Sequence, residues 1–221
     1  MTIDYAQARA AMVEQQVRPW WVLDKRVLDV LATLPREEFV PEAYRTVAYA
    51  DLEIPLGHGQ RMLKPVVAGR ALQSLLPQDH EEVLEIGTGS GYVTACLARL
   101  ARDVLSLERV PELADAARER LRAQGIGNAT VENADALGWD TSRRFDAIFV
   151  TAAVDQVPDR FLQWLRPGGR MFIVHGRAPV MEAVLVHRGG GEGANAGRTE
   201  SLFDTELGYM AGAEPAAEFH L

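Results

Sequence analysis

Residues 85–91, Glu-Ile-Gly-Thr-Gly-Ser-Gly, are the part of this sequence best suited to binding chemistry. The segment follows an apolar run typical of a buried strand and precedes a helical pattern, which is where parallel sheets bind ligands. Its glycines allow the backbone to approach a ligand, because no side chain stands in the way. The dinucleotide fingerprint requires glycine where Tyr92 stands, and the Gly-Lys-Ser/Thr of a P-loop is absent. The loop therefore indicates a site for a nucleoside without a pyrophosphate.

Three acidic residues stand where they can complete such a site. Glu108 ends the next predicted strand, 23 residues after Glu85, where a carboxylate can accept hydrogen bonds from both ribose hydroxyls. Asp135 follows the third strand, where a side chain can meet the edge of an adenine. Glu85 lies at the mouth of the first strand, close to a ligand's ammonium group or to the dipoles of the glycine loop. The combination predicts a nucleoside-type cofactor, and the alternative is a glycine-rich turn that binds nothing.

Alternating strands and helices must position these residues. Apolar runs predict parallel strands at 83–86, 104–108, 129–133, 145–151 and 170–175. Helical patterns lie between them at 92–100, 111–124 and 159–165. This alternation predicts a doubly wound α/β sheet with right-handed crossovers. Two further strands, 181–188 and 199–207, flank a glycine-rich segment, 188–197, which is expected to be a mobile loop, so they predict an antiparallel hairpin at the sheet edge.

Residues 1–80 have a different pattern, that of helices and loops. Asp24 is expected to cap a helix that Pro35 stops, and Pro65 is expected to begin a helix that Pro77 ends. The segment 41–64 has no clean period and predicts an ordered loop. Trp20 and Trp21 can either cover a site or pack within this region, and packing is the simpler interpretation.

Composition narrows the class of protein. The 221 residues carry a net charge of −8, most of it after residue 80, which argues against a nucleic-acid partner. No apolar run approaches the roughly 20 residues of a membrane helix, and no secretory signal pattern opens the chain. Cys96 is the single cysteine and is expected in the core, and the histidines show no metal-binding spacing. We expect a cytoplasmic protein without a metal, and the sequence does not indicate its oligomeric state.

Several blocks of sequence, in one order, resemble class I S-adenosylmethionine-dependent methyltransferases and, more narrowly, the protein-L-isoaspartate O-methyltransferase family. The blocks are PREEFVPE (35–42), AYADLEIPLGHGQ (48–60), VLEIGTGSGY (83–92), SLER (106–109), ALGW (136–139), FDAIFVTAA (145–153), PGGR (167–170) and VHGR (174–177). The resemblance runs from about Met12 to the C-terminus. It implies a Rossmann-like, seven-stranded, mostly parallel sheet with a reversed last strand, in a domain over 81–221, preceded by a helical subdomain over 1–80 that carries the acceptor loop.

The resemblance also implies a site. The cofactor would be S-adenosylmethionine, and the methyl acceptor would be a carboxylate of a protein or peptide, namely an isoaspartyl residue. The implied cofactor-binding residues are Glu85, Gly87, Thr88, Gly89, Ser90, Gly91, Glu108, Arg109, Asp135 and Ala136. The acceptor side would be built by the 57–65 loop, the end of the fourth strand and the VHGR turn. The acceptor-side candidates are His58, Gln60, Arg61, Leu63, Val150 and Thr151.

The acceptor loop departs from the family pattern. Family members typically have Thr-Ile-Ser-x-Pro after the GxGQ segment, whereas this chain has Arg61 in place of the Thr and Leu63 in place of the Ser. Arg61 either binds an acceptor carboxylate with paired hydrogen bonds or points to solvent together with Lys64. The alternative to an isoaspartyl methyltransferase is therefore a divergent member that binds the cofactor but methylates another acceptor or has a regulatory role.

Overall fold

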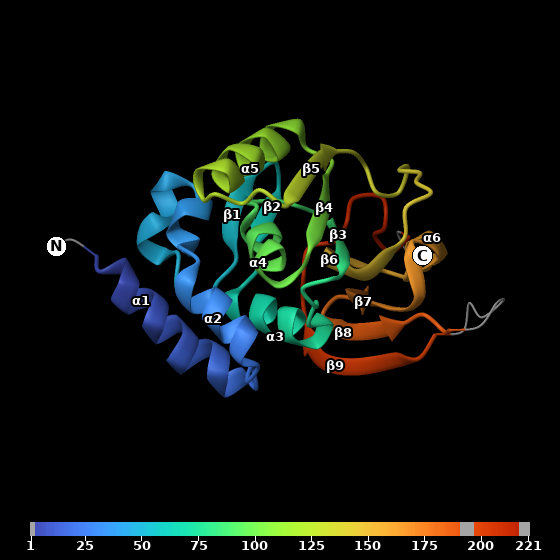
Figure 1. Cartoon of the computed structure of the whole chain (residues 1–221), viewed down its shortest axis with the longest axis horizontal. Helices are drawn as coiled ribbons and strands as arrows, with labels where there is room; N and C mark the ends of the chain where they lie inside the picture. Colours follow the sequence, from blue (N-terminus) through green and yellow to red (C-terminus); the bar gives the residue numbers. More distant parts are fainter. Residues whose placement is uncertain (1–2, 191–196, 217–221) are drawn as a thin grey trace, which may run out of the picture.

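A single seven-stranded sheet forms the centre of the molecule. The computed structural model describes residues 3–190 and 197–216 (Figure 1). The sheet has the strand order β5 (Ala129–Asn133), β4 (Asp103–Glu108), β3 (Glu82–Ile86), β6 (Phe145–Val154), β7 (Leu165–Arg177), β8 (Val180–His187) and β9 (Thr199–Thr205). β8 runs antiparallel to both of its neighbours, and the other strands are parallel to one another. The predicted mostly parallel sheet with a C-terminal antiparallel hairpin is confirmed.

The reversed strand is not the one that the family resemblance implied. β8 is the next-to-last strand, while the last strand, β9, pairs antiparallel with β8 and so points in the same direction as β7. The prediction of a reversed last strand is wrong because two successive antiparallel pairings restore the original direction. As a result β9 leads back to the same end of the sheet as the parallel strands.

Helices cover both faces of the sheet, because successive residues of its central strands are apolar and point to opposite faces. Val83 and Leu84 of β3 are both completely buried, in separate clusters on opposite faces. The helices around the sheet are α3 (Pro65–Leu75), α4 (Tyr92–Leu100), α5 (Pro111–Ala123) and α6 (Asp159–Gln163). β3 has β4 on one side and β6 on the other, so the direction of winding changes at β3. Such a switch point opens a crevice at the carboxyl ends of the two strands.

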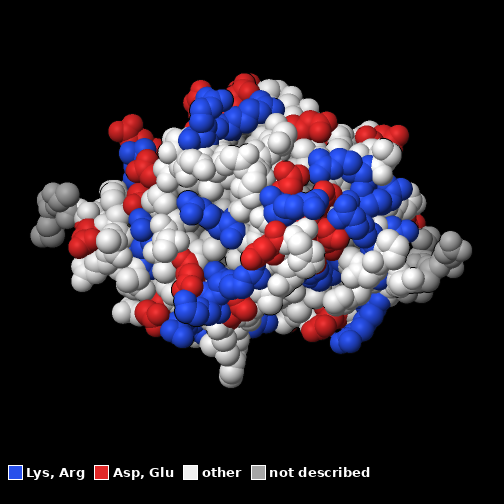
Figure 2. Space-filling view, in the orientation of Figure 1, with Lys and Arg blue, Asp and Glu red and all other residues white. Residues whose placement is uncertain are grey.

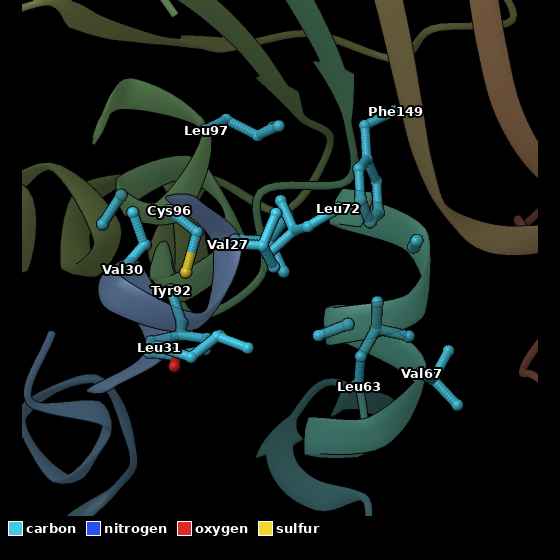
Figure 3. Close-up of a cluster of buried hydrophobic side chains, with 14 of the residues drawn as sticks. Val27, Val30, Leu31, Leu63, Val67, Leu72, Tyr92, Cys96, Leu97 and Phe149 are labelled. Atoms are coloured by element: carbon cyan, nitrogen blue, oxygen red, sulfur yellow. The ribbon is translucent and has the colours of Figure 1, made fainter. Parts of the chain in front are cut away.

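The N-terminal region packs against this helical layer. Its elements are α1 (Tyr5–Ala11), η1 (Met12–Val17), η2 (Arg18–Trp20), α2 (Lys25–Thr33), η3 (Arg36–Phe39) and η4 (Glu42–Val47). Asp24 caps α2 as predicted, because its side chain accepts hydrogen bonds from the backbone of Arg26 and Val27. Figure 3 shows side chains of α2, α3, α4 and β6 in one apolar cluster. The division of the chain at residue 80 stays a prediction.

The segment 41–64 contains more regular structure than its sequence indicated. Besides η4 it forms a hairpin of β1 (Ile54–Gly57) and β2 (Gln60–Met62). His58 and Gly59 make the two-residue turn with φ of 53° and 72°, and positive φ at both positions is typical of tight hairpins. The strands are too short to show an alternating pattern, which is why the sequence indicated only a loop.

Trp20 and Trp21 do not pack inside the N-terminal region. They are 48% and 71% exposed, so the prediction that they pack is wrong, whereas Cys96 is buried as predicted. Most of the expected loop at 188–197 lies outside the described residues. Among the described residues, no helix is long and apolar enough to span a bilayer. Figure 2 shows cationic and anionic side chains interspersed over one face of the molecule, with neutral surface between them.

Candidate functional site

A pocket opens at the carboxyl ends of β3, β4 and β5 and beside β6, where the winding of the sheet changes direction. The hairpin β1–β2 and a C-terminal segment after β9 close its other side. The predicted cofactor residues that line it are Gly87, Thr88, Gly89, Ser90, Glu108, Arg109, Asp135 and Ala136. Tertiary structure therefore brings together residues from the ends of three strands, as their sequence positions indicated.

The glycine loop has a conformation that other residues tolerate poorly. Gly87, Gly89 and Gly91 have φ of 95°, 53° and 85°, a region that strongly favours glycine. A Cβ atom on Gly87 would also collide with Thr151 Oγ1. That hydroxyl lies against the loop and interacts with the carbonyl oxygens of Ile86 and Gly87, at 3.0 and 2.7 Å. Gly91 itself does not line the pocket but precedes the first residue of α4.

Glu108 holds the glycine loop in place. Its carboxylate accepts hydrogen bonds from the backbone N–H groups of Gly89, at 2.8 Å, and Val110, at 2.9 Å. The residue is only 5% exposed, and it lines the pocket. Each carboxylate oxygen has a second lone pair, so these two bonds leave acceptor capacity for ligand hydroxyls. Glu108 can thus shape the loop and bind a sugar at the same time.

Glu85 lies beneath the pocket and does not line it. Its side chain is completely buried, and Oε2 accepts hydrogen bonds from Thr94 Oγ1, at 2.5 Å, and Ser106 Oγ, at 2.6 Å. Ser106 is in turn 2.5 Å from Thr88 Oγ1, which belongs to the glycine loop. Burial raises the pKa of Glu85 to about 8, and the two hydroxyl donors only partly oppose that rise. Glu85 therefore supports the loop from below as a buried acid.

Two side chains of opposite charge, Asp135 and Arg109, line the pocket after β5 and β4. Asp135 lines it and accepts a hydrogen bond from the backbone of Leu137 at 3.0 Å, which fixes the turn after β5. Arg109 lines it as well, and its guanidinium lies 3.5 Å from the carbonyl oxygen of Ala211. Among the described residues, no group of three or more His, Cys, Asp or Glu side chains is arranged to hold a metal ion.

The acceptor-side candidates divide into two groups. Gln60, Arg61, Leu63 and Thr151 line the pocket. His58 lies exposed at the tip of the hairpin and does not line it, and Val150 is completely buried in the core. Within the described part of the chain, neither Arg61 nor its neighbour Lys64 makes an ion pair, and only Arg61 reaches the pocket.

A buried cation that the sequence did not single out holds the acceptor loop. Arg36 is completely buried and donates hydrogen bonds to the carbonyl oxygens of Leu63, at 2.7 Å, and Ala48, at 2.8 Å. Its guanidinium carbon lies 4.8 Å from the centroid of the Tyr92 ring, at the start of α4. Burial lowers the pKa of Arg36. One side chain thus links the acceptor loop to the helix that follows the glycine loop.

The C-terminal segment also contributes a wall that the sequence did not indicate. Residues 207–211 line the pocket and lie along the end of β6, where Met210 N donates to Ala153 O at 2.7 Å. Tyr209 Oη donates to the carbonyl oxygen of Gly176 at 3.0 Å and accepts from Ala178 N at 3.1 Å. The VHGR segment (174–177), which was predicted as a turn, forms the end of β7, and it contacts the pocket wall through Gly176 but does not line the pocket. No sequence signal connects a segment after the last strand with the glycine loop.

Comparison with known proteins identifies the family. A family model described as "Protein-L-isoaspartate(D-aspartate) O-methyltransferase (PCMT)" matches residues 7–193. This chain belongs to that family. A protein-L-isoaspartate O-methyltransferase of Myxococcus xanthus is 49% identical over 153 residues, which cover 69% of this chain and 72% of that protein. Another, protein-L-isoaspartate O-methyltransferase 1 of Syntrophobacter fumaroxidans, is 42% identical over 188 residues, which cover 85% and 88%.

Solved structures share the fold. A Plasmodium falciparum chain described as a protein-L-isoaspartate O-methyltransferase, in complex with S-adenosyl-L-homocysteine, superposes with a TM-score of 0.78 at 19% identity, covering 91% of this chain and 97% of that one. The isoaspartate methyltransferase family model ends at residue 193, so the pocket wall at 207–211 lies outside the matched region. The family match therefore includes the glycine loop and the acceptor loop but not the whole pocket.

Proposed function

We propose that this protein transfers the methyl group of S-adenosylmethionine to the free carboxylate of isoaspartyl residues in damaged proteins. The observation that carries the proposal is one pocket lined on one side by the glycine loop with Glu108 and Asp135, and on the other by the acceptor loop at Arg61 and Leu63. Membership of the isoaspartate methyltransferase family supports the same reaction.

The residues of the pocket fit this cofactor. Glycine at position 87, where φ is positive, presents backbone rather than a side chain to the pocket. Glu108 keeps acceptor capacity for the hydroxyls of a ribose. Asp135 lines the pocket and would accept a hydrogen bond from an adenine amine, and Arg109 and Ala136 line the pocket as well. When bound, S-adenosylmethionine supplies a methyl group activated by a sulfonium. Buried Glu85 is connected to the glycine loop by hydrogen bonds through Ser106 and Thr88 and so helps to fix the conformation of that loop.

The reaction requires orientation more than acid–base chemistry from the protein. A carboxylate acceptor is already ionised at neutral pH, so no general base has to remove a proton. Holding the acceptor oxygen in line with the methyl carbon and sulfur contributes about 7–11 kcal/mol in favourable cases. Leu63 is buried beside the acceptor space and excludes water from it, and Arg36 fixes the Leu63 backbone.

Arg61 is the residue that we assign to the acceptor carboxylate. It lines the pocket from β2, and among the described residues it has no carboxylate partner that would compete with a ligand. A guanidinium binds a carboxylate with two parallel hydrogen bonds, and a hydrogen bond to a charged group contributes about 1.5–3 kcal/mol. Arg61 would thereby replace the hydroxyl that the family pattern has at Leu63.

The test is methyl transfer from labelled S-adenosylmethionine to an isoaspartyl peptide, scored as base-labile methyl ester. We expect turnover with the isoaspartyl peptide and none with the matching aspartyl peptide. Arg61→Ala should raise the peptide KM by about 10-fold to 100-fold, as expected from the loss of about 1.5–3 kcal/mol. Lys64→Ala is the matched control, because Lys64 does not line the pocket, and it should change KM less than twofold. An unchanged KM in Arg61→Ala would remove the carboxylate-binding role.

A second candidate function rests on Leu63. A family member without the acceptor-loop hydroxyl could bind the cofactor and methylate another acceptor, or serve a regulatory role. The family match across most of the chain does not favour this alternative. Binding of S-adenosylmethionine without turnover of any isoaspartyl peptide would support it. We also propose a cytoplasmic location, which agrees with a single cysteine and therefore no disulfide within the chain.

A further inference from the structure

The pocket contains a carboxylate that the proposed reaction does not use. Three acidic side chains line the pocket, namely Glu53, Glu108 and Asp135. Glu108 and Asp135 accept hydrogen bonds from backbone N–H groups. Glu53 is half-buried, and it forms no hydrogen bond and no ion pair with any residue of 3–190 or 197–216. Its carboxylate oxygens are therefore free to contact a ligand.

The hairpin β1–β2 determines which side chains share a face with Glu53. Its register pairs Pro55 of β1 with Arg61 of β2. Continued by two residues, the same register places Glu53 opposite Leu63 and diagonally across from Arg61. Alternate residues of a strand point to the same face, so Glu53, Arg61 and Leu63 lie on one face of the hairpin. All three line the pocket. Glu53 thus belongs to the acceptor side of the pocket.

Glu53 and Arg61 have opposite charges on this face but do not neutralise each other. Diagonal neighbours across a hairpin have Cβ atoms about 7–8 Å apart. In the described part of the chain, no ion pair joins the two side chains. The acceptor side therefore offers a guanidinium and a carboxylate that are close together and separately available. A ligand with a negative and a positive group at a similar spacing would bind both.

A substrate with only a negative group would leave Glu53 without a partner. A carboxylate that is covered by a bound ligand loses water, and this loss is unfavourable unless a cation or a hydrogen-bond donor replaces the water. A second carboxylate at the same place would add Coulomb repulsion, whereas an ammonium or guanidinium group would be attracted. Glu53 can therefore distinguish acceptors by the charge near the methylated residue.

We infer that Glu53 is a specificity-determining residue that selects isoaspartyl substrates with a lysine or arginine close to the methylated residue. The inference rests on the proposed function, in which Arg61 binds the acceptor carboxylate. Inside a polypeptide the isoaspartyl residue offers no ammonium group of its own, because its nitrogen is part of a peptide bond. The cation must then come from a neighbouring side chain. Alternate residues of an extended chain point to the same side about 7 Å apart, which matches the spacing of Glu53 and Arg61.

The experiment compares isoaspartyl heptapeptides that differ in one flanking residue. The residue two positions before or two positions after the acceptor is lysine, glutamine or glutamate, and the other side chains are uncharged. With the natural protein we expect kcat/KM to be highest for lysine and lowest for glutamate on at least one side, with about a fivefold difference between lysine and glutamine. In Glu53→Gln this difference should fall below about twofold. Glu42→Gln is the matched control, because Glu42 is exposed on η4 and does not line the pocket, and it should keep the difference of the natural protein.

Two further measurements sharpen the assignment to the substrate. Charge reversal in Glu53→Lys should invert the order, so that the glutamate peptide becomes a better acceptor than the glutamine peptide. Calorimetry with S-adenosylmethionine and S-adenosylhomocysteine tests the other source of a cation, since only the first compound carries a sulfonium. Glu53→Gln should leave the ratio of these two affinities unchanged. A loss of affinity for S-adenosylmethionine alone would overturn the inference, because Glu53 would then face the cofactor.

Binding of fluorescent versions of the same peptides, measured by anisotropy, separates this inference from the proposed function. If the natural protein prefers the lysine peptide, Glu53→Gln binds both peptides equally and neither protein methylates them, the proposed function fails and the charge selection stands. Methylation of all the peptides with equal kcat/KM by the natural protein would overturn the inference and leave the proposed function intact. A preference for lysine that persists in Glu53→Gln would overturn it as well.

Discussion

The two walls of the pocket are built in different ways. The cofactor wall comes from the ends of β3, β4 and β5, and its glycine loop is held by a neighbouring strand, as Gly89 is by Glu108. The acceptor wall comes from the β1–β2 hairpin and residues 207–211, which lie outside the seven-stranded sheet. Arg36 of η3 holds the acceptor loop at Leu63, and backbone hydrogen bonds to Ala153 of β6 hold residues 207–211.

This difference separates what the fold requires from what a substrate requires. A parallel sheet places the ends of its strands together, so a change in the cofactor wall disturbs the loop conformation itself. The acceptor wall sits on a two-stranded hairpin, where a side chain can be exchanged without rebuilding the sheet. The substitutions Arg61 and Leu63, relative to the family pattern, occur on that second wall. We expect substitutions to have large effects on cofactor binding at the first wall and graded effects on acceptor use at the second.

The largest effect is expected for Gly87→Ala. The φ of 95° at this position is unfavourable for alanine, and the new Cβ would collide with Thr151 Oγ1, so the loop must move. S-adenosylmethionine binding, measured by calorimetry, should weaken at least 100-fold. Gly127→Ala is the control, since no atom lies within 4 Å of its added Cβ, and it should bind normally. Normal binding by Gly87→Ala would show that the cofactor wall tolerates change as well as the acceptor wall does.

An intermediate effect on stability is expected for Glu85→Gln. The pKa of Glu85 is raised from 4.5 to about 8 in the folded protein, so stability that is fully present below pH 4.5 is lost as pH rises to about 8. The loss amounts to about 1.4 kcal/mol per pH unit in this interval, and glutamine lacks it. Relative to the natural protein, the Tm of the variant should therefore rise by about 5–10 °C between pH 6 and pH 8.5. The exposed Glu112→Gln serves as control, and an equal pH response in both variants would contradict a buried acid at residue 85.

The smallest effect is expected for Leu63→Ser, which introduces the hydroxyl of the family pattern. Leu63→Ala is the matched variant, because both lose the same buried side chain and become less stable. A single hydrogen bond contributes about 0.5–1.5 kcal/mol net, so kcat/KM for an isoaspartyl peptide should be about 2-fold to 10-fold higher in the serine variant than in the alanine variant. S-adenosylmethionine affinity should be the same in both. A serine variant no faster than the alanine variant would show that Arg61 already supplies this interaction.

Local sequence patterns are sufficient to predict most helices and strands of the sheet domain. The helix Tyr92–Leu100 begins and ends at the predicted residues, and six of the seven strands lie within three residues of their predicted bounds. The strand β7 (Leu165–Arg177) begins five residues before the predicted 170–175. Sequence patterns predict such elements because the central strands are continuous apolar runs and the helices are apolar on one face. For the β1–β2 hairpin, in contrast, the sequence predicts only a loop, since strands of three or four residues are too short to show an alternation of apolar and polar residues. The prediction that Trp20 and Trp21 pack within the N-terminal region is wrong, because an aromatic residue gives no signal of which side of a turn it faces.

From the amino-acid sequence alone one obtains the order of strands and helices, the glycine loop and the carboxylates at the strand ends, because short-range sterics and burial specify these features. Contacts between segments far apart in the chain cannot be obtained in this way. Arg36 on the Leu63 carbonyl, the direction of β9, the pocket wall after it and the outward tryptophans all depend on how segments far apart in the chain pack together. Only the three-dimensional packing decides these, since no local pattern encodes which distant group a side chain will meet.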